Sequence, residues 1–224
     1  MTRTLFITGA SSGIGAATAR AAVAAGWNVG LFARSAEVLE ALAGELGENR
    51  ALALPGDATD LGAQEAAVVE LVARFGGLNA AFANAGRGVD RPGTENGDPA
   101  EWRAVVDLNI MGLLFTTRAV LPELRKTRGH LVITGSAAGR THIRGSIYGA
   151  TKWFVHGYAG NMAEEMRDWG GRLTLIAPGM VDTPFFAEPK PGKIRPEDVA
   201  DAVVFALNAR PSAAMREIAI MPTD

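Results

Sequence analysis

The sequence alternates short apolar runs with longer stretches of helical periodicity. The short runs are nearly continuous hydrophobic segments, as expected of parallel strands that helices cover on both faces. They lie at residues 4–7, 28–33, 51–54, 80–83, 130–134, 173–177 and 217–221. The helical stretches lie at residues 13–25, 35–46, 61–74, 101–126, 147–168 and 196–207. This alternation predicts an α/β fold: a doubly wound, seven-stranded parallel sheet with helices on both faces and right-handed crossovers.

The chain is long enough for one sizeable core, because it has 224 residues of which 48% are hydrophobic. We therefore expect a single domain over residues 1–224. The absence of cysteine excludes disulfides, thiolate catalysis and cysteine metal sites. His130 and His156 do not have the spacing of metal ligands, so we expect no metal site.

Charge and hydropathy narrow the classes of partner. A net charge of -2 supplies no basic field that would attract nucleic acid or an anionic membrane. The first apolar run is too short for a signal peptide or a membrane span. We expect a cytoplasmic enzyme that binds neither nucleic acid nor membrane.

A glycine-rich turn follows the first predicted strand and opens a helix. In a doubly wound sheet the ligand crevice lies at this carboxyl end of the strands. Glycine permits positive φ and lets backbone N–H groups approach a pyrophosphate, and the helix N-terminus favours the anion. The spacing G-x-x-x-G-x-G in this place predicts a nucleotide site made by Gly9, Ser11, Ser12, Gly13, Ile14 and Gly15.

Arg34 follows the second predicted strand, where an acidic residue would hold the adenosine ribose of NAD. A guanidinium suits the 2'-phosphate of NADP instead. Hydroxyl groups of Ser11, Ser12 and Ser35 would add hydrogen bonds to that phosphate. Ser35 is also expected to cap the helix that begins there. We therefore expect NADP(H) as the cofactor in preference to NAD(H).

The third and fourth strands also end in residues that suit a nucleotide. Asp57 and Ala58 follow the third strand, and the Asp57 carboxylate would either accept from the adenine amino group or start the next turn. Asn84, Ala85 and Gly86 follow the fourth strand. These small residues would let a cofactor lie close to the backbone.

Tyr148 and Lys152 are four residues apart on a predicted helix that Ser146 is expected to cap, so they share one face. A nearby cation favours phenolate and lowers the pKa of a tyrosine. Bringing a phenol from ~10 to neutrality takes a shift of roughly 3 units, or about 4 kcal/mol. Such a tyrosine would serve as a general acid and base near pH 7.

The motifs together resemble those of the short-chain dehydrogenase/reductase family, over essentially the whole chain and in the family's order. They are the glycine turn from Thr8 to Gly15, Asp57, Ala83-Asn84-Ala85-Gly86, Asn109, Ser136, Tyr148-x-x-x-Lys152 and Pro178-Gly179-Met180-Val181-Asp182-Thr183. The resemblance implies a Rossmann-type fold, a nicotinamide cofactor, and hydride exchange between an alcohol and a carbonyl.

The resemblance also implies roles for the catalytic residues. Tyr148 would exchange a proton with the substrate oxygen, and Ser136 would hold that oxygen near the phenol. Lys152 would lower the tyrosine pKa and bind the nicotinamide ribose. Asn109 would anchor a water that connects the lysine to solvent. Pro178, Gly179, Val181 and Thr183 would meet the nicotinamide carboxamide.

Two features depart from the family pattern. Ala83 stands where the family usually has an asparagine, which removes one amide but keeps Asn84. The interval from Ser136 to Tyr148 is about one residue shorter than the commonest spacing, so the loop between them should be tighter. This departure bears on the shape of the substrate pocket more than on the chemistry.

The substrate is expected to be a small carbonyl or alcohol. The segment from Pro184 to Arg195 is short for a lid, which predicts an open site unless a neighbouring subunit completes it. Arg140, His142 and Arg144 would favour an anionic substrate, although such residues also occur as a solvated loop surface.

Two other functions on this or a related fold are alternatives to the dehydrogenase. The same fold would serve as a nucleotide sensor without turnover, although the retained tyrosine and lysine favour an enzyme. A sugar-nucleotide epimerase or dehydratase would need a larger C-terminal domain. Residues 101–126 and 147–168 are apolar on more than one side, which predicts a homodimer or homotetramer.

Overall fold

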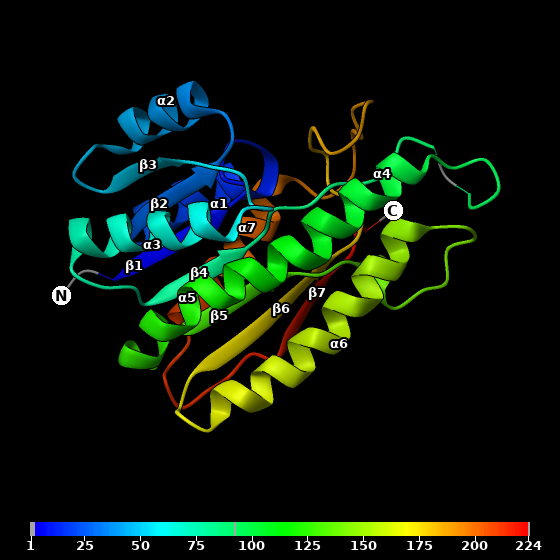
Figure 1. Ribbon diagram of the computed structural model, residues 1–224. Coiled ribbons are helices and arrows are strands. Elements are labelled where there is room, and N and C mark those ends of the chain that lie inside the picture. The colour runs from blue at the N-terminus through cyan, green and yellow to red at the C-terminus, as the bar shows by residue number, and fades with distance from the viewer. Residues whose placement is uncertain (1–2, 92, 224) are drawn as a thin grey trace.

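Seven parallel strands form one sheet in the order β3-β2-β1-β4-β5-β6-β7 (Figure 1). The structure is a computed structural model that describes residues 3–91 and 93–223. The strands are β1 Thr4–Thr8, β2 Asn28–Ala33, β3 Ala51–Pro55, β4 Ala80–Ala83, β5 His130–Thr134, β6 Arg172–Pro178 and β7 Glu217–Ile220. The predicted parallel sheet is confirmed. The prediction succeeded because parallel strands that are buried on both faces appear in the sequence as continuous hydrophobic runs.

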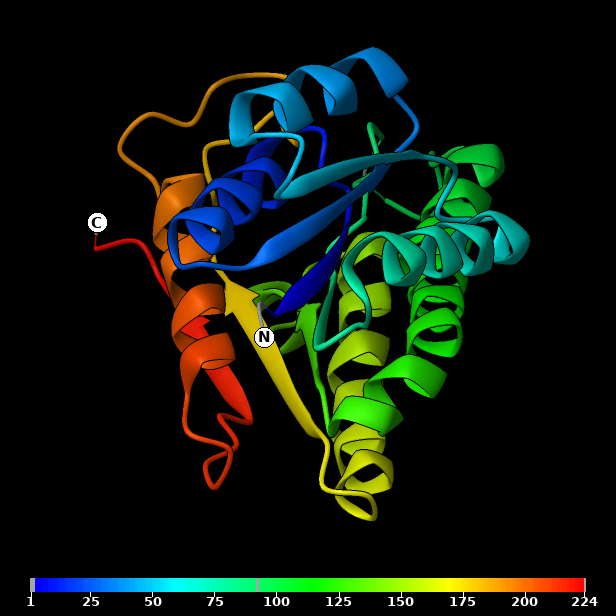
Figure 2. The same cartoon turned by 90° about the vertical axis from the view of Figure 1, so that its left-hand side faces the viewer.

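Helices cover both faces of this sheet, as predicted (Figures 1 and 2). They are α1 Gly13–Ala24, α2 Ala36–Leu46, α3 Leu61–Phe75, α4 Pro99–Val106, α5 Leu113–Thr127, α6 Ile147–Arg167 and α7 Pro196–Asn208. Buried residues of α3, α5 and α6 pack on one face of the sheet. Those of α1, α2 and α7 pack on the other face. The two cores establish a doubly wound fold of the Rossmann type.

The helix predicted at residues 101–126 contains a π-helical turn. The segment runs from Pro99 to Thr127, and its α4 and α5 parts are joined by π-helix at Asp107–Gly112. This segment is long and apolar enough to cross a membrane, but the core helix of a soluble protein meets the same criteria of length and composition. Leu113, Val120 and Leu124 of α5 are buried in the core beside α3. The π turn was not predicted, and it contains Asn109.

Local capping was predicted correctly at one helix and wrongly at another. Ser146 begins α6, and its Oγ accepts a hydrogen bond of 2.9 Å from Gly149 N. Ser35 precedes α2, but its hydroxyl makes no capping hydrogen bond to any part of the helix that the structure describes. Ser35 has an extended backbone like Ser146, so residue type and position alone do not secure a cap.

The sheet order reverses between β1 and β4, and this junction is held by hydrogen bonds at its carboxyl end. Thr8 Oγ1 accepts from Asn84 N at 3.0 Å and from Ala85 N at 3.1 Å. Asn84 Nδ2 donates to Thr8 O at 3.1 Å. In doubly wound sheets the ligand crevice lies at such a switch point.

Candidate active site

The glycine turn between β1 and α1 makes a close-packed backbone loop at the switch point. Gly9 and Gly13 have φ of +67° and +50°, which side-chain-bearing residues rarely adopt. A Cβ on Gly15 would lie 2.1 Å from Gly9 O, so only glycine fits there. Ser12 is the N-cap residue of α1, and within the described part of the chain its side chain makes no capping hydrogen bond. The first N–H groups of the helix thus remain available to an anion.

The predicted carboxamide segment lies against this same turn. A Cβ built on Gly13 would be 3.1 Å from Thr183 Cγ2, which places residue 183 beside the glycine loop. Val181 is buried and pairs with Ile194 in an isolated parallel bridge. Gly179 follows β6 and donates its N–H to Ile220 O at 2.8 Å. Two segments far apart in sequence therefore lie side by side at this end of the sheet, where the sequence predicts a nucleotide.

The predicted adenosine end is solvent-exposed. Arg34 and Ser35 are exposed at the end of β2, and Arg34 has no hydrogen bond or ion pair with any residue that the structure describes. Asp57 Oδ1 accepts from Thr59 N and Thr59 Oγ1, both at 2.8 Å. The backbone hydrogen bond from Thr59 holds the pKa of Asp57 below its usual value, and the charge of Arg34 acts in the same direction. Asp57 therefore starts a turn before α3, and Ala58 beside it is buried.

Ser136, Tyr148 and Lys152 lie together where β5 ends beside α6. The Ser136 side chain, 9% exposed, lies close enough to the Tyr148 phenol to favour its ionised form. Lys152 Nζ lies 5.7 Å from the centre of the Tyr148 ring. It donates a hydrogen bond of 2.9 Å to Thr134 O, the last carbonyl of β5. Three residues of the predicted catalytic set are thus brought into contact or close proximity.

Burial controls the ionisation of both groups on α6. It raises the pKa of Tyr148, while the neighbouring Ser136 side chain acts in the opposite direction. Desolvation lowers the pKa of Lys152 to about 8. The expectation that Lys152 lowers the tyrosine pKa remains a prediction, because Ser136 is the group that opposes the effect of burial here.

Asn109 connects the π turn to α6, the helix that contains Tyr148 and Lys152. Its Oδ1 accepts from Arg87 N at 2.9 Å, and its Nδ2 donates to Arg87 O at 3.0 Å. The same Nδ2 also donates to Thr151 Oγ1 at 3.1 Å, and that hydroxyl donates to Tyr148 O at 2.7 Å. A buried amide therefore fixes the loop after Gly86 relative to α6.

The segment after Thr183 reaches Tyr148, the tyrosine predicted to be catalytic. Because Phe185 is itself exposed, the open site stays a prediction. The Phe185 ring lies 5.4 Å from the Tyr148 ring, centre to centre. It also borders Gly88, where an added Cβ would be 3.2 Å from Phe185 Cζ. Phe185 remains partly exposed. Sequence reasoning noted its aromatic character but had no signal for this long-range contact.

The three basic residues expected to favour an anionic substrate do not act as a group. Arg140 forms an ion pair with Glu217. His142 stacks on Trp153 with ring centres 5.2 Å apart. Arg144 lines a hollow of about 430 Å³ together with Glu95 and the backbone near Gly93.

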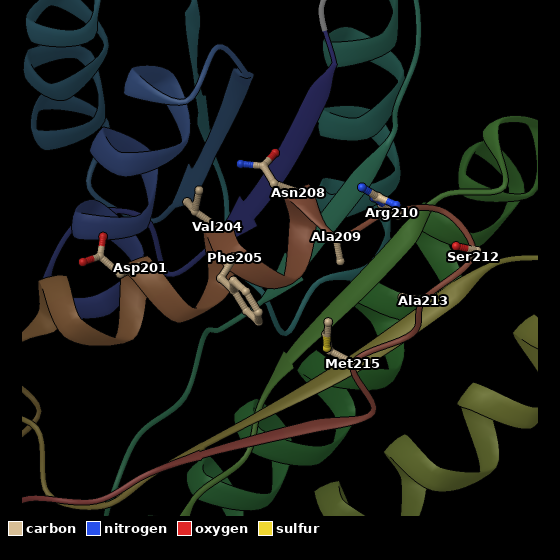
Figure 3. A pocket seen from close by; sticks show the side chains of 9 residues that line it. All are labelled: Asp201, Val204, Phe205, Asn208, Ala209, Arg210, Ser212, Ala213 and Met215. Carbon is tan, nitrogen blue, oxygen red and sulfur yellow. The ribbon is translucent and has the colours of Figure 1, made fainter.

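A separate hollow of about 670 Å³ lies away from these residues, at the C-terminal end of α7 (Figure 3). Its lining includes Val204, Phe205 and Met215, and it contains none of the predicted catalytic or cofactor residues.

Among the described residues, no cluster of three His, Cys, Asp or Glu could hold a metal ion.

Comparison with known proteins agrees with this geometry. The family model for short chain dehydrogenases matches residues 3–193. The chain belongs to the short-chain dehydrogenase family. An oxidoreductase of Staphylococcus aureus (strain USA300), itself uncharacterised, is 34% identical over 221 residues, covering 96% of this chain and 95% of the relative. The family predicted from the motifs is therefore confirmed.

Solved structures of other short-chain dehydrogenases share the whole fold. An alcohol dehydrogenase from Thermococcus sibiricus, complexed with 5-hydroxy-NADP, has a TM-score of 0.92 and 28% identity. The match covers 100% of this chain and 97% of that one. A 3-ketoacyl-(acyl-carrier-protein) reductase from Brucella melitensis, complexed with NADH, has a TM-score of 0.91 and 25% identity. This match covers 99% of this chain and 97% of the reductase chain. These short-chain dehydrogenases include one bound to an NADP derivative and one bound to NADH.

We predict that Gly15→Ala disrupts the nucleotide turn, because its Cβ would collide with Gly9 O. Relief of that overlap would cost about 1–3 kcal/mol of unfolding free energy and would weaken NADPH binding. The matched control is Gly44→Ala in α2, whose Cβ would meet none of the described atoms within 4 Å. That variant should gain about 0.4–1 kcal/mol. Thermal melting and NADPH fluorescence titration measure both effects, and equal behaviour of the two variants would contradict the prediction.

Proposed function

We propose that this short-chain dehydrogenase is an NADP(H)-preferring oxidoreductase that interconverts a small carbonyl compound and its alcohol. The observation that carries the proposal is the grouping of Tyr148, Ser136 and Lys152 at the end of β5. The glycine turn and Thr183 border the same end of the sheet. The family and the cofactors bound by its solved members support this assignment.

The protein side of the reaction follows from these contacts. The nicotinamide, when bound, would supply or accept the hydride. During reduction Tyr148 would give its phenolic proton to the substrate oxygen, and during oxidation it would accept that proton. Ser136 would hold the oxygen close to the phenol. Lys152 would stabilise the phenolate and bind the nicotinamide ribose, and Asn109 would anchor a water that links Lys152 to solvent.

Cofactor preference rests on the exposed end of β2. Arg34 would pair with the 2'-phosphate of NADP, and Ser11, Ser12 and Ser35 would contribute hydroxyl groups. Among the described residues Arg34 makes no hydrogen bond or ion pair, although its charge acts on Asp57, so binding the phosphate would break no existing ion pair. Ala58, Asn84, Ala85 and Gly86 would line the path of the cofactor, with Asp57 at its adenine end.

The proposal extends to the oligomeric state and the location of the protein. Trp153 and Phe154 of α6 are 44% and 38% exposed, which favours pairing of this helix with a second copy of the chain. We propose a cytoplasmic homodimer or homotetramer.

Replacement of Tyr148 by Phe removes the proposed proton donor while keeping the ring. We expect Tyr148→Phe to lower turnover at least about 100-fold, with NADPH affinity nearly unchanged. The chain has two tyrosines, so Tyr158→Phe is a matched control that should retain turnover. The measurement is NADPH oxidation over a carbonyl panel, together with NADPH fluorescence titration. Equal turnover by Tyr148→Phe and the parent would refute the mechanism, and NADPH binding without turnover in the parent would favour a sensor.

Replacement of Arg34 by Asp tests the cofactor preference. The carboxylate would repel the 2'-phosphate of NADPH and accept from the ribose hydroxyl of NADH. We expect the NADPH-to-NADH affinity ratio of Arg34→Asp to fall at least about tenfold, or about 1.4 kcal/mol. Separate fluorescence titrations with the two cofactors give this ratio. An unchanged ratio would remove Arg34 from the phosphate site.

A further inference from the structure

Helix α6 contacts the loop after β5 through a stripe of three residues. Tyr148, Lys152 and His156 follow one another at intervals of four, so they lie on one side of the helix. Lys152 Nζ donates to Thr134 O at 2.9 Å, and His156 Nε2 lies 3.0 Å from Ser136 O. The stripe thus bonds two alternate carbonyls of the segment that carries Ser136.

The imidazole of His156 is closely enclosed by that segment. A Cβ built on Gly139 would lie 2.4 Å from His156 Cδ2, and one built on Gly135 would lie 2.9 Å from Nε2. Neither position has room for a side chain while the ring occupies this space. The loop from Gly135 to Gly139 is therefore shaped around His156, and Ser136 lies inside it.

Two contacts with Ser136 bear on the tautomer of the ring. His156 Nε2 lies 3.0 Å from Ser136 O and 3.5 Å from Ser136 N. The shorter contact favours the tautomer in which Nε2 carries the proton, because Ser136 O can only accept. Burial lowers the pKa of His156, opposed by the contact with Ser136 and by the charge of Glu217. Arg140 and Lys152 also act to lower it. The ring is accordingly a neutral donor near pH 7.

Ser136 has its main chain and its side chain held by different partners. Its carbonyl meets His156, while its Oγ accepts from Ala138 N at 3.1 Å. The same side chain lies near the Tyr148 phenol and favours its ionised form. A shift of the Ser136 backbone would therefore change the distance between hydroxyl and phenol.

We propose that His156 is a positioning residue, which fixes the backbone of Ser136 so that its hydroxyl stays beside the Tyr148 phenol. The role does not involve contact with substrate. Its catalytic consequence rests on the proposed function, but its effect on Tyr148 does not. The phenol of Tyr148 therefore reports on the role of His156 directly.

The test compares His156→Gln with His156→Asn. The Gln amide nitrogen can take the place of Nε2 and donate to Ser136 O, whereas the Asn amide is one methylene shorter. Tyr158→Phe is included in every protein, so Tyr148 is the single tyrosine left. Incorporation of 3-fluorotyrosine then gives one ¹⁹F signal, and the more acidic fluorophenol ionises at less alkaline pH than tyrosine.

We expect the acid dissociation constant of the fluorophenol to fall about three- to tenfold in His156→Asn, because the nearby Ser136 hydroxyl favours phenolate. His156→Gln should match the parent. The inference is overturned if the Asn variant titrates like the parent, or if both variants shift equally. Gly139→Ala is the substitute test if His156→Asn does not fold, because its Cβ would displace the His156 ring. It should shift the acid dissociation constant of the fluorophenol in the same direction as His156→Asn.

Kinetics separate this inference from the proposed function. With a carbonyl that the parent reduces, His156→Asn should lower kcat about tenfold without changing NADPH affinity, and His156→Gln should restore it. A parent that binds NADPH and reduces no carbonyl would contradict the proposed function, while the titration would still decide the role of His156.

Discussion

The contact between α6 and the end of β5 is the interaction on which the candidate site depends. Thr134 and Ser136 offer carbonyls to Lys152 and His156 at 2.9 and 3.0 Å, and Tyr148 lies on the same side of the helix. Strand β5 is held in the middle of the sheet, between β4 and β6. The position of the phenol is thus tied to a buried strand in the interior of the sheet.

Polar side chains join the remaining parts of the site to this contact. Thr134 Oγ1 donates to Asn84 Oδ1 at 3.1 Å, and Asn84 in turn donates to Thr8 O. Asn109 links the loop after Gly86 to Thr151 of α6. Asn84 therefore ties the glycine turn to the end of β5, and Asn109 ties the loop after Gly86 to α6, so each amide holds two separate segments together.

The fold was predictable from the sequence because strands buried on both faces leave continuous hydrophobic runs. Gly9, Gly13 and Gly15 were also readable, since their spacing after a strand has a steric cause. Other features depend on contacts between distant residues. The π turn around Asn109 and the packing of Phe185 on Tyr148 left no local signal. His156 was dismissed as a metal ligand, and its spacing from Lys152 was the available clue to a role on α6.

Proton exchange by Tyr148, assisted by Lys152, is the central claim, and in the structure burial raises the pKa of that phenol. The most direct measurement is the ¹⁹F titration of fluorotyrosine 148, in the Tyr158→Phe background and saturated with NADP⁺. The titration is run on the protein that retains Lys152 and on the Lys152→Met variant. The account predicts that the phenol ionises at clearly lower pH when Lys152 is present, because the ammonium stabilises phenolate. Coincident titration curves would contradict it.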